Sequence, residues 1–144
     1  GVGLFSVCDY VLTHEKAKFG FTEVRLGLIP AVISSFCLKK IGQSNARAWF
    51  LSGEKFDANI ALKIGLVDKV SSVESFEENS KKCIESFLKA GPNAARSAKK
   101  LIKNVCNLDE PKDYTCSEIA KIRVAPEGQE GMSALLEKRK ASWI

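Results

Sequence analysis

Short apolar runs alternate with turn residues over the first 70 residues, a pattern typical of mixed α/β structure. Residues 1–8 predict a short buried helix, and two short strands are expected around a turn at residues 14–16. Two helices should follow, the first ended by Gly42 and the second ended near Gly53. The predicted strands cover residues 10–13 and 18–21, and the predicted helices cover residues 31–41 and 44–51.

Asp57 stands where its carboxylate can cap a helix over residues 58–64. Gly65 should end that helix, and the apolar residues 66–70 are predicted to form a strand directly after it. Helix, turn and strand in so few residues indicate an ordered core in this part of the chain.

From Val73 onward the apolar positions recur every three to four residues, which predicts amphipathic helices separated by prolines. Four are expected, at residues 73–89, 92–106, 110–123 and 128–141. The change of pattern near residue 71 divides the chain into an α/β portion, 1–70, and a helical portion, 71–144.

The composition, 45% hydrophobic and 27% charged over 144 residues, is that of one globular unit. No run of about 18 apolar residues occurs, and the opening residues lack the basic start and cleavage site of a signal peptide. We therefore expect a cytoplasmic protein with no membrane partner. The first residue is glycine and no cap precedes the opening apolar stretch, so we also expect the chain to be the remainder of a longer protein.

The cysteine and histidine content limits the catalytic and metal-binding arrangements that the chain could form. Five cysteines, odd in number and widely spaced, favour reduced thiols over a disulfide framework or a zinc pair. His14 is the only histidine, which argues against a Ser-His or Cys-His catalytic arrangement and against a histidine metal site. No metal is expected, and catalysis would have to use carboxylates, backbone dipoles or lysines.

The net charge of +5 is concentrated in two late clusters, Lys99-Lys100-Lys103 and Lys138-Arg139-Lys140. Neither cluster is interleaved with the aromatic residues expected of a single-strand nucleic-acid binder. Solvated helix faces explain the charge, and no nucleic-acid partner is expected.

Two stretches carry a specific pattern of motifs. The first spans residues 1–67 and includes Cys8-Asp9, the run Glu-Val-Arg-Leu-Gly-Leu-Ile-Pro at 23–30, and Leu-Ser-Gly at 51–53. The second is the run Glu-Gly-Met-Ser-Ala-Leu-Leu-Glu-Lys-Arg at 130–139. In the order of their motifs and in their amino-acid sequence, the two stretches resemble the C-terminal part of the enoyl-CoA hydratase/isomerase (crotonase) family. The resemblance is closest to bacterial methylglutaconyl-CoA hydratase-like members.

This resemblance implies an α/β fold: the C-terminal part of a spiral ClpP/crotonase core, mostly helical with a few short strands. Residues 71–144 would then be a helical oligomerisation region, and the full-length protein a homotrimer or hexamer. The implied substrates are acyl-CoA thioesters, with coenzyme A as part of the substrate and no separate cofactor.

The resemblance implies that Glu23 is the catalytic acid/base, moving a proton next to a thioester whose enolate two backbone N–H groups stabilise. If the family resemblance is set aside, a structural role explains the two residues: Thr22 would cap a short helix, and Glu23 would favour the positive N-terminal end of the helix dipole. Hydratases of the family carry a second glutamate at the position of Gly3. The glycine leaves hydration or dehydration and double-bond isomerisation equally open.

Three further assignments follow from the resemblance. Gly1 would lie at the edge of the oxyanion hole, and Lys138 would reach the nucleotide end of coenzyme A, although a lysine near a helix C-terminus also suits the helix dipole. An apolar turn would line the acyl pocket, although core packing would explain it equally well. Its residues are Leu28, Pro30, Ala31, Val32 and Ile33.

A different class of function uses the same fold without catalysis, as an RNA-binding or assembly module presenting the basic helices. Binding to nucleic acid that weakens steeply with salt would mark the module, whereas turnover of acyl-CoA by the full-length chain would mark the enzyme.

Overall fold

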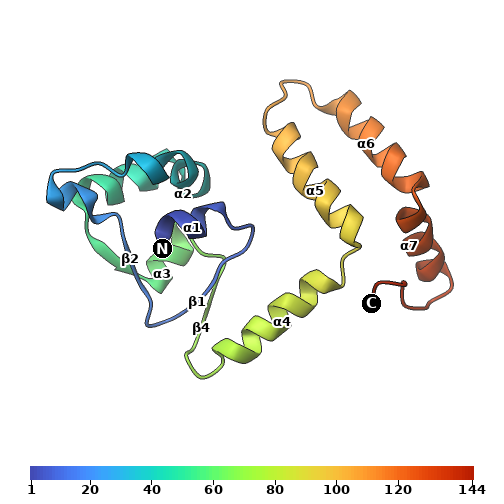
Figure 1. Cartoon of the computed structure of the whole chain (residues 1–144), viewed down its shortest axis with the longest axis horizontal. Helices are drawn as coiled ribbons and strands as arrows, with labels where there is room; N and C mark the ends of the chain where they lie inside the picture. Colours follow the sequence, from blue (N-terminus) through green and yellow to red (C-terminus); the bar gives the residue numbers. More distant parts are fainter. The chain divides into compact units, whose positions relative to one another are not determined.

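Eight short elements build the first part of the molecule, a computed structural model that describes residues 1–144 (Figure 1). They are α1 (Val2–Val7), β1 (Leu12–His14), β2 (Lys18–Gly20), η1 (Thr22–Leu26, a 3₁₀ helix), α2 (Ala31–Ser52), β3 (Lys55–Asp57), α3 (Ala58–Lys63) and β4 (Lys69–Ser71). Strand β1 pairs in parallel with β4, and β2 pairs antiparallel with β3. These elements confirm the predicted mixture of helices and short strands.

Two glycines bound the helical segments of α2 as predicted. Gly42 has φ 73° and ψ 162°, which interrupts the helix between its two segments. At the end of α2, Gly53 adopts a left-handed conformation (φ 60°) and its N–H donates to the carbonyl of Trp49. A side chain is strained at positive φ, so glycine suits both positions.

The junction from α3 to β4 differs from the prediction. The Asp57 cap is confirmed, because its Oδ1 accepts the N–H of Ile60 at 2.9 Å. Leu66 and Val67, however, are not in a strand: both donate their N–H groups to the carbonyl of Ala61, so these groups are unavailable to a neighbouring strand. The prediction of a strand over 66–70 was therefore wrong at its start, and pairing begins at Lys69.

The core lies between α2, α3 and the strands. Its largest fully buried side chains are Phe21, Leu66, Val67 and Cys37. The ring of Phe21 lies 4.6 Å from that of Phe50, centre to centre, and this contact fixes the chain directly before η1. Helix α1 covers one edge of the core but is not itself buried, since Leu4 is 66% exposed and none of its residues is fully buried. The expectation of a buried helix was wrong because α1 uses only one face.

Helices make up the rest of the chain. They are α4 (Phe76–Leu88), α5 (Pro92–Val105), α6 (Lys112–Val124) and α7 (Pro126–Leu136). The chain has two compact units, Gly1–Ser80 and Lys81–Ile144, rather than the single unit that its composition suggested. None of the helices combines the length and the apolar composition needed to cross a bilayer.

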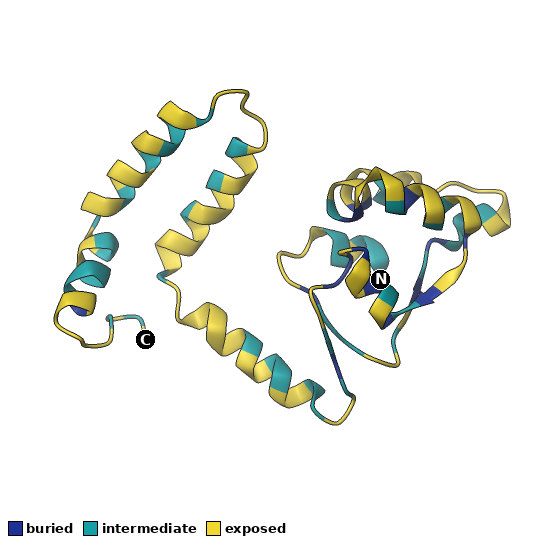
Figure 2. Cartoon of the chain, turned by 180° about the vertical axis from the view of Figure 1, so that it is seen from behind, coloured by how far each residue is buried: buried dark blue, intermediate teal, exposed yellow.

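Burial differs sharply between the two units (Figure 2). Nearly all buried side chains belong to the first unit, whereas in the second only Ala134 is buried. Large apolar side chains of the second unit remain exposed, among them Ile102, Ile119, Val124, Leu135 and Leu136. Its amphipathic helices therefore present apolar surface beyond what the unit itself covers.

Helix α7 ends earlier than predicted, at Leu136 instead of residue 141. Lys138 has a positive φ of 55°, which turns the chain out of the helix. Beyond this turn, the ring of Trp143 packs over Gly131, and its Nε1 donates to the carbonyl of Lys89 at 3.3 Å.

Candidate active site

Glu23 lies in η1, which follows the buried side chain of Phe21 and ends at a turn formed by Gly27. Phe21, two residues earlier, is completely buried. After η1, Gly27 takes a left-handed conformation (φ 72°), and the N–H of Leu28 donates to the backbone carbonyl of Glu23 at 3.1 Å. No side-chain hydrogen bond caps η1, so the interpretation of Thr22 as a helix cap was wrong.

The carboxylate of Glu23 has a buried oxygen, Oε2, without a hydrogen-bond partner. Buried polar atoms are almost always paired, because an unpaired one loses its bonds to water without replacement. An exception on an acidic side chain is a common mark of a site that binds a ligand or moves a proton.

Glu23 lines a small pocket of about 150 Å³ whose other walls are apolar. The other lining residues are Ile29, Pro30, Ala31, Val32 and Ile33. Four of the five residues predicted for the acyl pocket thus lie beside Glu23, whereas Leu28 does not line the pocket and is 60% exposed. Its neighbour Ile29 lines the pocket instead, and the assignment of the acyl site stays a prediction.

Helices α1 and α2 pack beside this pocket. Ser6 Oγ lies 3.0 Å from the Sγ of the buried Cys37. Burial raises the pKa of the Cys37 thiol, the hydrogen bond with Ser6 lowers it, and the charge of Glu23 raises it further, with a net increase.

Gly3, on α1, touches Ile33 of the pocket wall. A Cβ atom built on Gly3 would lie 2.6 Å from Cγ2 of Ile33, far inside a normal contact. Position 3 therefore has no room for a side chain while Ile33 keeps its place.

Gly1 lines a different pocket, of about 440 Å³, whose other residues include Phe5, Phe19 and Lys55. Its carbonyl accepts the N–H groups of Leu4 and Phe5 at the start of α1. The structure does not bring Gly1 and Glu23 into one pocket, and the oxyanion role of Gly1 stays a prediction.

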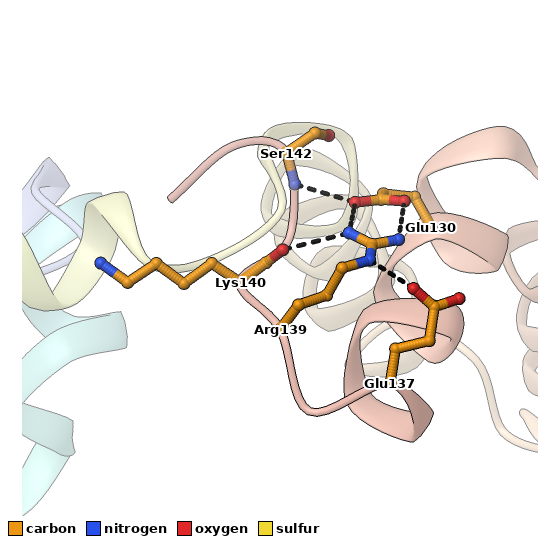
Figure 3. A network of polar contacts seen from close by, with 5 residues as sticks. All are labelled: Glu130, Glu137, Arg139, Lys140 and Ser142. Carbon is orange, nitrogen blue, oxygen red and sulfur yellow. Dashed lines mark hydrogen bonds and ion pairs between the residues drawn. The ribbon is translucent and has the colours of Figure 1, made fainter.

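Lys138 lies in the second unit, and Arg139, the next residue in the sequence, belongs to a network of ion pairs (Figure 3). Arg139 donates two hydrogen bonds to Glu130 and one, from Nε, to Glu137 at 2.7 Å. Glu130 also accepts the N–H of Ser142 at 2.9 Å. These bonds fix the turn that carries the exposed Lys138.

No group of three or more His, Cys, Asp or Glu side chains is arranged to hold a metal ion.

Residues 1–144 match the sequence model of one family, enoyl-CoA hydratase/isomerase, over their full length. The chain belongs to the enoyl-CoA hydratase/isomerase family.

Individual relatives agree with this family assignment. The crotonyl-CoA hydratase of Syntrophomonas wolfei is 30% identical over 147 residues, which cover 100% of this chain and 56% of that protein. A solved enoyl-CoA hydratase/isomerase structure from Marinobacter aquaeolei is 33% identical with a TM-score of 0.93, covering 99% of this chain and 55% of its own. A Legionella pneumophila protein assigned to the enoyl-CoA hydratase/isomerase (crotonase) group has the same TM-score of 0.93 at 38% identity, with coverage of 99% and 56%.

The chain therefore has the α/β fold of the crotonase family, and the family and fold predicted from the sequence are confirmed. It spans about half the length of the relatives it matches.

Proposed function

We propose that the full-length protein is an acyl-CoA enzyme in which Glu23 moves a proton on the acyl group. The buried, unpartnered Oε2 of Glu23 in an apolar pocket is the observation that carries this proposal. Membership of the enoyl-CoA hydratase/isomerase family supplies the substrate class.

A thioester carbonyl makes the chemistry accessible to one carboxylate. Removing a proton from the carbon beside the thioester, or adding water to a conjugated double bond, places negative charge on the carbonyl oxygen as an enolate. Backbone N–H groups directed at that oxygen stabilise it, typically by about 100- to 1000-fold in rate for each donor. Gly1, at the start of α1, is our candidate for the edge of this site.

The acyl group would lie against Pro30, Ala31, Val32 and Ile33, whose apolar side chains surround Glu23. A pocket of about 150 Å³ suits a short acyl chain. Hydration or dehydration and double-bond isomerisation both use this arrangement, because each needs a base beside the reacting carbons.

Two features of the second unit support the remaining parts of the proposal. Lys138, exposed on its turn, would attract the phosphates of coenzyme A. The exposed apolar side chains of α5 to α7 would be covered in a homotrimer or hexamer of the full-length protein. Residues 1–144 alone are expected to be inactive, since the family relatives are about twice as long.

The deciding experiment compares the full-length gene product with its Glu23→Gln variant on a 2-enoyl-CoA and a 3-enoyl-CoA. We expect turnover of at least one of the two thioesters and a loss of about 100-fold or more in kcat for the variant, since the amide cannot accept the proton. Glu15→Gln, at an exposed glutamate of the turn between β1 and β2, is the matched control and should keep full activity. Near-normal turnover by Glu23→Gln would refute the role.

The same preparation tests the non-catalytic alternative. If neither thioester is turned over and the protein binds RNA with an affinity that falls steeply with salt, the protein is a binding module instead.

A further inference from the structure

A lysine of α2 holds the C-terminal end of α1. Lys40 Nζ donates to the backbone carbonyl of Phe5 at 3.2 Å and to that of Cys8 at 3.3 Å. The same ammonium lies 3.7 Å from Oδ2 of Asp68, and the Lys40 side chain is 14% exposed. A lysine can satisfy the last carbonyls of a helix and favours the negative end of its dipole. Lys40 therefore ties the end of α1 to α2.

Asp68 holds the other end of the connection that follows α1. Its Oδ2 accepts the N–H of Val11 at 2.7 Å, and its own N–H donates to the carbonyl of Val11 at 2.8 Å. Segment 8–11, which joins α1 to β1, is thus bonded at Cys8 by Lys40 and at Val11 by Asp68. We call these two residues the Lys40–Asp68 clamp.

Helix α1 depends on restraints of this kind. It has six residues, none of them buried, and helices this short are unstable without tertiary contacts. Gly3 of α1 touches Ile33 in the wall of the Glu23 pocket, and Gly1, directly before α1, lines the pocket of about 440 Å³. A movement of α1 would therefore change the walls of both pockets.

The clamp acts on α1 from the helix that also forms part of the Glu23 pocket. Ile33, Cys37 and Lys40 are four and three residues apart on α2, spacings that keep side chains on one face of a helix. Each of them contacts α1, and the contact of Cys37 is with Ser6, at 3.0 Å between Sγ and Oγ. The position of α1 along this face is coupled to the position of Ile33 in the pocket.

We propose that Lys40 is a positioning residue for the acyl-CoA reaction. Through the Lys40–Asp68 clamp it sets the place of α1 against α2, and through the contact of Gly3 with Ile33 it keeps the wall of the Glu23 pocket in place. The proposal rests on the function proposed above and adds a residue that acts through α1 and not by contact with the reacting atoms.

Lys40→Met in the full-length protein tests the role, because methionine keeps most of the side chain and removes the ammonium. Small displacements around the reacting atoms slow the reaction strongly, so kcat should fall about 10-fold or more. The KM should change less than about 2-fold, since the coenzyme A part of the substrate still supplies its binding. Lys39→Met, at the exposed neighbouring lysine, is the matched control and should keep full activity.

Two further variants separate the charge from the bulk of the side chain. Lys40→Arg keeps a cation with N–H donors, so its kcat should stay within about 3-fold of the wild type. Asp68→Asn keeps an oxygen for the N–H of Val11 but removes the negative charge, and it should lower kcat. In the double variant Lys40→Met/Asp68→Asn the loss should be smaller than the product of the two single losses. A normal kcat for Lys40→Met, no rescue by arginine, or fully multiplicative losses would overturn the proposal.

Hydrogen exchange separates this inference from a failure of the proposed function. The amides of Leu4 and Phe5 donate to the carbonyl of Gly1, and Lys40→Met should speed their exchange at least about 5-fold while the amides of α3 stay unchanged. If the wild type is active and exchange in α1 is unchanged, the positioning role alone is wrong. If the wild type turns over no thioester, the function and the positioning role fall together, and exchange still decides whether the clamp holds α1.

Discussion

Arg139 holds Glu130 through both carboxylate oxygens, at 2.7 Å from Nη1 and 2.8 Å from Nη2 (Figure 3). Two parallel bonds fix both the distance and the plane of the pair, which a single lysine contact does not. Since Glu130 belongs to α7 and Arg139 follows it, the pair folds the end of the chain back onto that helix.

This pair predicts how stability depends on pH. The hydrogen bonds from Arg139 lower the pKa of Glu130 from 4.5 to about 2 in the folded protein. The stabilisation is therefore fully present above about pH 4.5 and is lost as the pH falls towards 2. Glu130→Gln should lower the Tm at pH 7, and its difference from the wild type should shrink steadily below pH 4.5.

Thermal unfolding of both proteins at several pH values is the measurement. Glu118→Gln is the matched control, because Glu118 makes a single hydrogen bond to Lys121 on an exposed helix face. An exposed pair of that kind contributes little, so the control should change the Tm much less. A Glu130→Gln deficit that is the same at pH 3 and pH 7 would contradict the assignment.

The Asp57 cap gives a second prediction, on the stability of the first unit. Its Oδ1 satisfies the N–H of Ile60 at the start of α3, a helix of only six residues. Asp57→Ala should lower the free energy of unfolding by about 1 kcal/mol, and Asp57→Asn, which keeps an accepting oxygen, by clearly less. Urea unfolding of the full-length protein checks the order, and equal losses for both variants would rule out a capping role.

The sequence predicted those parts of the fold whose cause is local. Asp57, Gly42 and Gly53 act on their own neighbours, so their effects can be found without the tertiary structure. Leu66 and Val67 were wrongly given to a strand because an apolar pair has the same pattern whether its N–H groups face a strand or the end of a helix. Beyond the early end of α7, Arg139 pairs with Glu130, and neither residue type marks the end of a helix in the sequence.

The candidate site also combines features that the sequence predicts with features that only the tertiary structure shows. Glu23 and the turn from Pro30 to Ile33 were found through family resemblance, and the structure places them in one pocket. Leu28 and Ile29 are equally apolar in the sequence, and only the structure shows that Ile29 lines the Glu23 pocket whereas Leu28 does not. The contact of Gly3 with Ile33 joins residues far apart in sequence, and a single sequence does not contain the packing register of two helices.

Lys138 provides a third prediction, on substrate affinity. If it attracts the phosphates of coenzyme A, Lys138→Ala should raise the KM for acyl-CoA about 3- to 10-fold while kcat stays unchanged. Salt screens such attraction, so the effect should shrink as ionic strength rises.

Lys140→Ala is the control for this prediction. The side chain of Lys140 extends away from the network around Glu130, and only its carbonyl takes part (Figure 3). Its KM should stay close to that of the wild type. A fall in kcat with an unchanged KM for Lys138→Ala would show that the assignment is wrong at this residue.

The last prediction concerns assembly of the full-length protein. Leu136 at the end of α7 is 83% exposed and the adjacent Leu135 is 78% exposed. Leu135 also borders an apolar pocket of about 280 Å³ that includes Ile122, Met132 and Trp143.

Covering one leucine contributes about 1.5 to 3 kcal/mol, so Leu136→Lys should weaken self-association about 10- to 100-fold. Sedimentation across a range of concentrations measures the shift, with Lys112→Glu, an exposed polar position at the start of α6, as the control for added or removed charge. Because an apolar contact gains little from charge attraction, the association of the wild type should also persist at high salt. A full-length protein that stays monomeric at every concentration, or a Leu136→Lys variant that assembles like the wild type, would exclude this surface from the subunit contact.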